Sequence, residues 1–131
     1  MDRYNISIKR FDEFAKEYAE RFKNIDAYLS VIDRFCDLII PGKPRILELA
    51  CGPGNITAYI RKRFPGSEYI AIDLAPAMIN IARENIKGVD FRLMDVRKIS
   101  SFNTKFDAIM CSFCLPFLSK TDAHKLVYDS A

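Results

Sequence analysis

The feature that most constrains the fold is a glycine-containing turn set between two short apolar runs. Residues 45–50 read Arg-Ile-Leu-Glu-Leu-Ala and lead into a turn that contains Gly52 and Gly54. A helix-like pattern follows, and a second apolar run over 68–73 then ends in Asp73. The order strand, turn, helix, strand is typical of a parallel α/β unit, in which ligands bind at the carboxyl ends of the strands.

The remaining sequence continues this alternation, which predicts an α/β fold with a parallel sheet and right-handed crossovers. Pro65 and Gly66 are expected to close the first helix, because both residues interrupt regular structure. Beyond the first two strands, the expected elements are helices over about 55–64 and 76–87, strands over 89–94 and 105–111, and a last helix from Ser119 or Thr121 through Tyr128.

Residues 1–40 are predicted to form a helical arm, and residues 41–131 are predicted to form the core. The segment 41–44, Pro-Gly-Lys-Pro, is a strong breaker between the two parts. Two amphipathic helices are expected within residues 10–39, with Asp26 as the cap of the second. Their apolar stripes are Phe11, Phe14, Ala15, Tyr18, Phe22 and Ile25, and then Leu29, Ile32, Phe35, Cys36 and Ile39.

The last predicted strand, 105–111, raises a question about completeness because it is apolar on both faces. Parallel strands are normally covered, and this one has little of the protection that natural sheets place on an edge strand. We therefore expect that the chain is truncated after the fourth strand, or that another chain completes the sheet. If the 131 residues are complete, we expect homo-oligomers that form through this edge.

Composition limits the expected partners and location. The net charge is only +3, and the longest basic cluster, 61–63, is predicted to be a solvated helix face, so nucleic acid is not an expected partner. No apolar run approaches the roughly 18 residues of a membrane span, so no membrane partner is expected. The four cysteines lie in apolar segments without a signal-peptide core, which predicts buried, reduced thiols and a cytoplasmic location.

The turn indicates a nucleoside-containing cofactor. Asp73 follows it at the distance from which an acid can hold a ribose diol. The dinucleotide pattern Gly-x-Gly-x-x-Gly is incomplete, because Thr57 occupies the third glycine position. A β-branched residue there disfavours a pyrophosphate cofactor, which counts against the alternative of an NAD- or FAD-binding half-domain. No Gly-Lys-Ser/Thr follows the turn, so it is not a P-loop.

The core resembles the first half of a class I S-adenosylmethionine (SAM)-dependent methyltransferase of the small-molecule type. The likeness rests on four segments in order, Leu47–Gly54, Tyr69–Met78, Asp90–Val96 and Phe106–Leu118, and Phe11–Tyr18 is similar to the helix before the core in that family. The resemblance implies a Rossmann-like parallel sheet that forms the first four strands of a seven-stranded fold. It also implies SAM as the cofactor and methyl transfer to a small-molecule acceptor as the activity.

The same resemblance implies roles at the methionine end of SAM. Gly52 and Gly54 would let the backbone approach the methionine part, and Glu48 would lie beneath the turn and help to fix it. The backbone at Cys111 would accept from the ammonium group, and Tyr18 would close over the cofactor. The family often has a further glycine at position 50, where this chain has alanine, and no loss of binding is expected from that difference.

At the adenosine end, the resemblance implies a second group of binding residues. Asp73 would accept hydrogen bonds from both ribose hydroxyls, since a carboxylate offers two oxygens. Leu74 and Met78 would pack against the adenine ring. Asp95 would accept the adenine amino hydrogen, with Val96 beside it.

The catalytic residues are not predicted. Pro116 stands where many relatives have a histidine, so no general base is assigned. Cys111 and Cys114 are interpreted as packing residues, because a redox Cys-x-x-Cys normally opens a helix and a structural zinc site needs four ligands. A SAM-binding or dimerisation module without catalysis remains an alternative to an enzyme.

Overall fold

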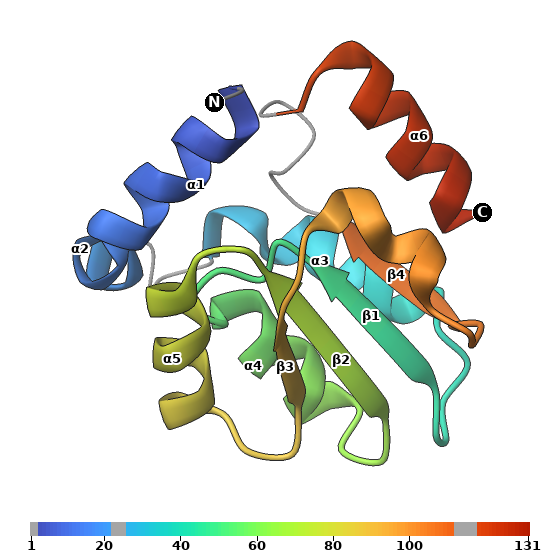
Figure 1. The fold of residues 1–131 in the computed structure, drawn as a ribbon. Coiled ribbons are helices and arrows are strands. Elements are labelled where there is room, and N and C mark those ends of the chain that lie inside the picture. Colours follow the sequence, from blue (N-terminus) through green and yellow to red (C-terminus); the bar gives the residue numbers. More distant parts are fainter. Residues whose placement is uncertain (1–2, 22–25, 112–117) are drawn as a thin grey trace.

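The computed structural model describes residues 3–21, 26–111 and 118–131. Within them the strands are all parallel and form one sheet of order β3-β2-β1-β4 (Figure 1). The strands are β1 (Arg45–Leu49), β2 (Glu68–Asp73), β3 (Asp90–Leu93) and β4 (Ala108–Cys111). The predicted α/β class with four parallel strands is therefore confirmed.

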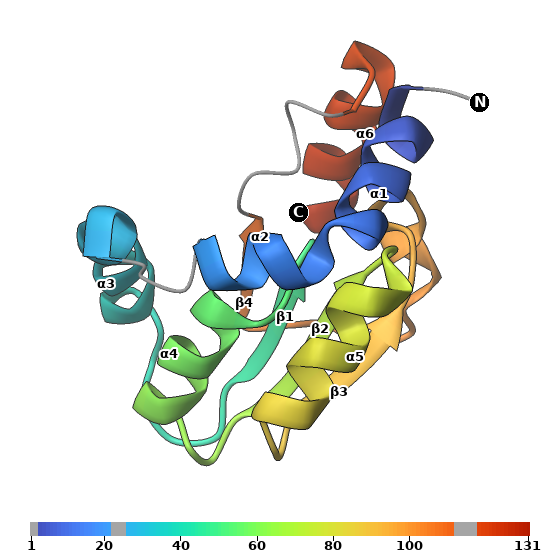
Figure 2. The same ribbon diagram turned by 90° about the vertical axis from the view of Figure 1, so that its left-hand side faces the viewer.

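Helices cover both faces of the sheet, which explains why β1 is apolar on both sides. Ile46 packs with the layer of α3, α4 and α5, whereas Leu47 and Leu49 pack with η2 and α6 on the opposite face. Figure 2 shows α3, α4 and α5 together on one side. The bounds are α3 (Leu29–Asp37), α4 (Asn55–Arg63), α5 (Pro76–Asn85), the 3-10 segment η2 (Val96–Ser101) and α6 (Lys120–Ser130).

The arm begins earlier than predicted and is divided differently. It consists of α1 (Arg3–Glu13), α2 (Ala15–Arg21), the 3-10 turn η1 (Asp26–Tyr28) and α3. The expected single stripe through Phe14 is wrong, because the chain turns there and leaves that side chain exposed. The turn lets Ala15 bury itself against Ala75 and Met78. The expected cap Asp26 is also wrong, because the N-cap of α3 is Tyr28; Phe22 and Ile25 lie outside the described residues.

Helices α1 and α2 of the arm, together with α6, lie at the carboxyl ends of the strands. Figures 1 and 2 both show α1 and α6 beyond these ends, and α1 and α2 contact α5. Tyr4 at the start of α1 belongs to the same apolar cluster as Leu126 of α6. This end of the sheet, where ligands of parallel α/β proteins bind, is therefore the end that α1 and α2 cover.

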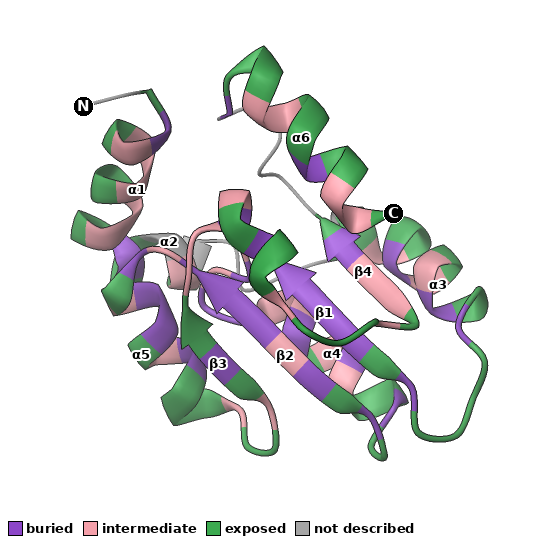
Figure 3. Ribbon diagram, turned by 45° about the vertical axis from the view of Figure 1, so that its right-hand side comes forward, coloured by how far each residue is buried: buried purple, intermediate pink, exposed green. Residues whose placement is uncertain are grey.

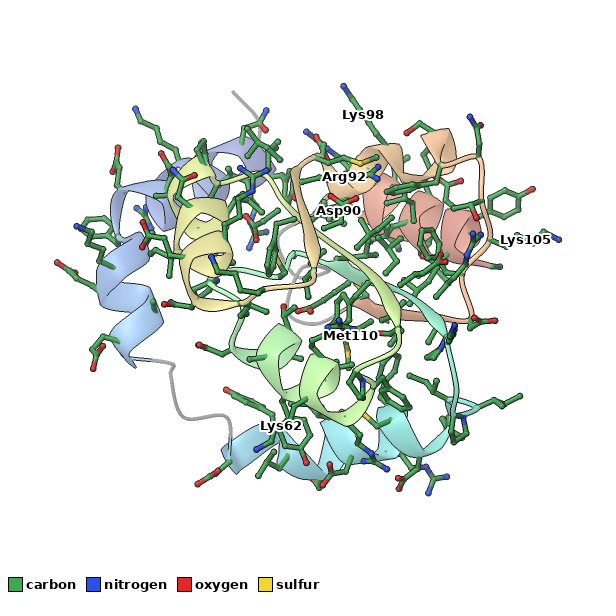
Figure 4. All side chains as sticks on the ribbon, turned by 90° about the horizontal axis from the view of Figure 1, so that it is seen from below. Lys62, Asp90, Arg92, Lys98, Lys105 and Met110 are labelled. Carbon is green, nitrogen blue, oxygen red and sulfur yellow. The ribbon has the colours of Figure 1, made fainter. Side chains whose placement is uncertain are left out.

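The β4 edge is less buried than the centre of the sheet. Figure 3 shows β1 and β2 largely buried, whereas β4 is mostly intermediate or exposed. Met110 is its buried residue and points toward the layer of α3 and α4 (Figure 4). Among the described residues, β4 pairs with β1 and no strand pairs with its other side.

Candidate functional site

The turn after β1 takes its shape from left-handed backbone at alternate positions. Ala50, Gly52 and Gly54 have φ angles of 55°, 58° and 93°. A side chain at Gly54 would meet Ile86, since a Cβ there would lie 2.5 Å from Cδ1 of that residue. At Gly52 a Cβ would have no neighbour within 4 Å. Gly54 thus allows α5 to pack closely, whereas Gly52 borders open space that a ligand can enter.

Asp73 at the end of β2 joins the turn to the loop before α5. Its Oδ2 accepts a hydrogen bond of 2.8 Å from the backbone N–H of Gly52, and its Oδ1 accepts one of 2.9 Å from that of Ala75. The residue is 7% exposed. Burial raises the pKa of Asp73, and the N–H groups of Ala75, Gly52 and Leu74 partly offset that rise. The carboxylate is therefore held in one orientation at the rim of the turn.

Glu48 in β1 lies beneath the same turn and is 0% exposed. Its Oε1 accepts hydrogen bonds of 2.6 Å from the Thr57 hydroxyl and of 2.6 Å from the Tyr69 hydroxyl. Its Oε2 is buried and has no hydrogen-bond partner among the described residues. Burial raises the pKa of Glu48 to about 7, the two hydroxyls lower it, and the negative charge of Asp73 raises it.

Thr57 and Tyr69 were not predicted as site residues, although the sequence carries a signal for both. Tyr69 lies on the face of β2 that Ile46 and Glu48 share in β1, because the register pairs Ile46 with Tyr69. Thr57 was interpreted only as a residue that interrupts a dinucleotide pattern. Its hydroxyl instead donates to Glu48 and so connects α4 to β1, which helps to hold the turn between them.

Asp95 follows β3 and is engaged by a nearby arginine. It is the N-cap of η2, with Oδ1 accepting 2.9 Å from the backbone N–H of Arg97. The guanidinium of Arg97 donates through Nε at 3.0 Å to both carboxylate oxygens and through Nη2 at 2.7 Å to Oδ2. The sequence analysis did not identify Arg97, because an Asp-x-Arg spacing does not by itself indicate a binding site.

The apolar residues expected near the adenine ring lie between the sheet and the arm. Met78 is buried in a cluster with Ala15 and Ala75, and Val96, the first residue of η2, is also buried. Leu74 is partly buried against the cluster that contains Val96. The arm is also tied to α5 by Asp12, whose Oδ1 accepts 2.8 Å from the backbone N–H of Ala77. Sequence reasoning did not identify Asp12.

The other expected residues are less fully described. Cys111 ends β4 beside Leu49 and is exposed, so the expectation that it is a buried packing residue is wrong, because it lies at the edge of the sheet. Tyr18 belongs to α2, but its side chain lies outside the described part of the structure, as do Cys114 and Pro116. Among the described residues, no group of three metal-ligating side chains is arranged to hold a metal ion, and no helix is long and apolar enough to cross a membrane.

The site brings together acceptors that suit a nucleoside. A carboxylate has about four acceptor positions, and the hydrogen bonds that Asp73 accepts from backbone N–H groups leave capacity on its oxygens for ribose hydroxyls. Gly52 lies next to this carboxylate and has no bulk above it. The residues present at the ends of β1 and β2 therefore fit a ribose and its substituents.

The sequence model of a methyltransferase domain family matches residues 46–130. The chain belongs to this methyltransferase domain family. The match begins in β1 and runs into α6, so the methyltransferase domain includes the turn, Glu48, Asp73 and Asp95.

Known relatives share this methyltransferase domain. Malonyl-[acyl-carrier protein] O-methyltransferase from Bacillus cereus is 33% identical over 119 residues, 85% of this chain and 42% of the relative. The solved SAM-bound amino pentose methyltransferase from Micromonospora echinaspora has 30% identity and a TM-score of 0.69, over 88% of this chain and 48% of that one. Magnesium protoporphyrin IX methyltransferase from Synechocystis PCC 6803, at 16% identity and a TM-score of 0.74 over 99% of this chain and 71% of that one, supports the fold alone.

The chain spans about two fifths of the length of the first curated relatives. It covers 38% of the residues of one relative and 42% of those of another. The residues that match the family model, 46–130, contain the turn and the strands β1 to β4 of this chain.

Proposed function

We propose that this chain is the cofactor-binding part of a SAM-dependent methyltransferase that acts on a small-molecule acceptor. The observation that carries the proposal is Asp73, which is fixed by the N–H of Gly52 and keeps acceptor capacity at the open side of the turn. Membership of the methyltransferase domain family supports it, and it disfavours an NAD- or FAD-binding half-domain.

At the methionine end, we propose that the backbone of Gly52 and Gly54 approaches the amino-acid part of SAM. The open space at Gly52 supports this role. Glu48 acts from below by holding the turn through Thr57 and Tyr69. The backbone of Cys111 accepts from the ammonium group, and Tyr18 closes over the bound cofactor.

At the adenosine end, we propose that Asp73 binds the ribose diol and that Asp95 accepts one adenine amino hydrogen. Arg97 makes four hydrogen bonds to Asp95 through three N–H hydrogens, because the single Nε hydrogen is shared between the two oxygens. Three hydrogens therefore occupy most of the roughly four acceptor positions of the carboxylate. The capacity that remains suits a single amino hydrogen. Leu74, Met78 and Val96 supply apolar surface beside the ring.

Methyl transfer from SAM requires alignment of the cofactor and the acceptor more than it requires acid–base groups in this part of the chain. SAM supplies an activated methyl group on a sulfonium. The residues around the turn hold and orient the cofactor and exclude water, and such positioning supplies about 7–11 kcal/mol in favourable cases. A general base is needed only where the acceptor atom carries a proton of high pKa.

The acceptor class is proposed from the names of relatives. One relative is named for malonyl-[acyl-carrier protein] and one solved structure for an amino pentose. Both names describe small groups, and the aromatic residues of the arm would help to form an apolar wall around such a group. The division into an arm, 1–40, and a SAM-binding core, 41–131, belongs to the same proposal.

The first test is calorimetric binding of SAM and S-adenosylhomocysteine to the wild type and to Asp73→Asn. We expect micromolar binding by the wild type and weakening by tenfold or more in the variant, because an amide is a poorer partner for two hydroxyls. Binding of NAD instead of either ligand would contradict the proposal. Binding without turnover against candidate acceptors would favour a module without catalysis.

We also propose that copies of the 131-residue chain associate through β4, in a reducing, cytoplasmic location. Within the described residues no strand pairs with the outer side of β4, and a hollow of about 350 Å³ beside it is lined in part by Ile109, Leu126 and Val127; both support association. Cys36 and Cys51 are buried thiols, which supports the location. Val127→Lys should lower the sedimenting mass, whereas Ile6→Lys on the exposed part of α1 should not.

A further inference from the structure

Arg97 connects three elements at the adenosine end of the site. Its guanidinium binds the Asp95 carboxylate in η2, lies over the ring of Tyr4 in α1 with Cζ 4.8 Å from the centroid, and approaches Asp122 in α6 at 3.6 Å. The arginine side chain is 22% exposed and the Asp95 side chain 11% exposed. A single partly buried cation therefore links the arm, the loop after β3 and the last helix.

The geometry at Asp95 restricts how its carboxylate can turn. The guanidinium is a rigid planar fork that donates through two nitrogens, and the backbone N–H of Arg97 holds Oδ1 as well. Lysine could supply the charge but not the fork. The plane of the carboxylate is thus set by Arg97 rather than by a ligand.

A second arginine in the chain has the same spacing without the same surroundings. Arg92 donates at 2.8 Å to Asp90, two residues earlier, and lies over Phe102 with Cζ 5.6 Å from the centroid (Figure 4). Its side chain and that of Asp90 are 47% and 52% exposed. The local motif Asp-x-Arg is therefore present twice, and only the pair at Asp95 lies beneath the arm and α6.

We propose that Arg97 is a positioning residue that makes Asp95 selective for the 6-amino group of adenine. This inference rests on the proposed SAM-binding function. Because Arg97 fixes the carboxylate, Asp95 presents its remaining acceptor position in one direction, toward an amino donor. In a ligand with a carbonyl in place of the 6-amino group, the carbonyl oxygen would face the Asp95 carboxylate. Both groups are acceptors, so neither would be satisfied. Contacts of Arg97 with Tyr4 and Asp122 hold the arm and α6 around the same place.

The test is to compare the affinities of S-adenosylhomocysteine and its 6-deaminated analogue, S-inosylhomocysteine, by calorimetry. We expect the wild type to prefer the adenine ligand by at least about 100-fold, since a buried polar group that loses its partner is strongly disfavoured. Arg97→Met should reduce this ratio by tenfold or more. Arg92→Met is the matched control and should leave the ratio unchanged.

The ratio separates positioning from a merely structural role. A variant that weakens both ligands equally would overturn the proposal, and so would a wild type that binds both ligands alike. A wild type that binds neither ligand would instead contradict the proposed function. Arg97→Lys, which keeps the charge and the stem, is used if Arg97→Met does not fold; it should also reduce the ratio, and an unchanged ratio would overturn the proposal.

Discussion

The ends of β1 and β2 are built differently from the ends of β3 and β4. At the first pair, Glu48 and Asp73 are buried and bind groups brought from other elements. At the second pair, Asp95 is held by Arg97, two residues later, and Cys111 is exposed at the edge of the sheet. The difference predicts that substitutions at the first pair should change stability as well as cofactor affinity. Those at the second pair should act mainly on ligand selectivity and association.

The largest effect is expected at the turn beside β1. Gly54→Ala should reduce the free energy of unfolding by about 2–5 kcal/mol, because it combines a left-handed residue with a Cβ against Ile86. Gly52→Ala should cost only about 1–2 kcal/mol, since the space there is open. Urea denaturation of both variants measures the difference, and equal losses would contradict the role assigned to Ile86.

The pH dependence of stability should reveal Glu48. It keeps its proton in the folded protein up to a pKa of about 7, against 4.5 as the ordinary value. The folded state therefore binds more protons between these values, and the free energy of unfolding should fall as pH rises through this window. The expected loss is about 3 kcal/mol at 1.36 kcal/mol per unit.

Glu48→Gln tests this directly, because the amide does not titrate. Relative to the wild type, the variant should gain stability as the pH is raised from 5 to 8. Urea denaturation at several pH values, with the exposed Glu68→Gln as the control, measures the gain. Parallel pH profiles for the wild type and Glu48→Gln would show that Glu48 ionises normally.

A smaller effect is expected at Ala50. Its φ of 55° is left-handed, and this conformation costs a residue with a Cβ about 1–2 kcal/mol. Glycine relieves that strain but loses more entropy on folding, so Ala50→Gly should stabilise the protein by about 1 kcal/mol or less. Thermal unfolding of the wild type and of Ala50→Gly measures this gain in stability. Ala58→Gly, on the exposed side of α4, should destabilise by about 1 kcal/mol.

The smallest effect should come from the exposed pair in β3. Asp90→Asn breaks the ion pair with Arg92, but exposed ion pairs contribute about 0–1 kcal/mol. Asp95→Asn should cost more, because that carboxylate is largely buried and also caps η2. Double-mutant cycles with Arg92 and with Arg97 measure the coupling energy of each ion pair. Equal coupling energies would contradict the expectation that the pair at Asp95 contributes more.

Local sequence signals predicted much of the fold. The run 68–73 is β2 as expected, Pro76 opens α5, and the Ser119 hydroxyl caps α6 by accepting from the N–H of Asp122. Each of these features depends on neighbouring residues alone. The placement of Glu48 beneath the turn followed from the resemblance, and the roles given to the site residues stay predictions.

What the sequence did not predict depends on contacts between distant residues. The break at Phe14 accompanies the packing of Ala15 on α5, and Asp12 binds Ala77 far along the chain. The hydroxyl of Tyr69 reaches Glu48 only after β1 and β2 have paired. Periodicity carries no information about such contacts, because it describes one element at a time.

The register of β1 also bears on the order in which the chain assembles. Arg45 is joined to Glu68 of β2 across 23 positions, but to Asp107, just before β4, across 62 positions. Closing the longer loop costs about 0.9 kcal/mol more in chain entropy. We therefore expect β1 and β2 to pair before β4 joins them. Destabilising substitutions in β4 should then speed unfolding while leaving the folding rate nearly unchanged.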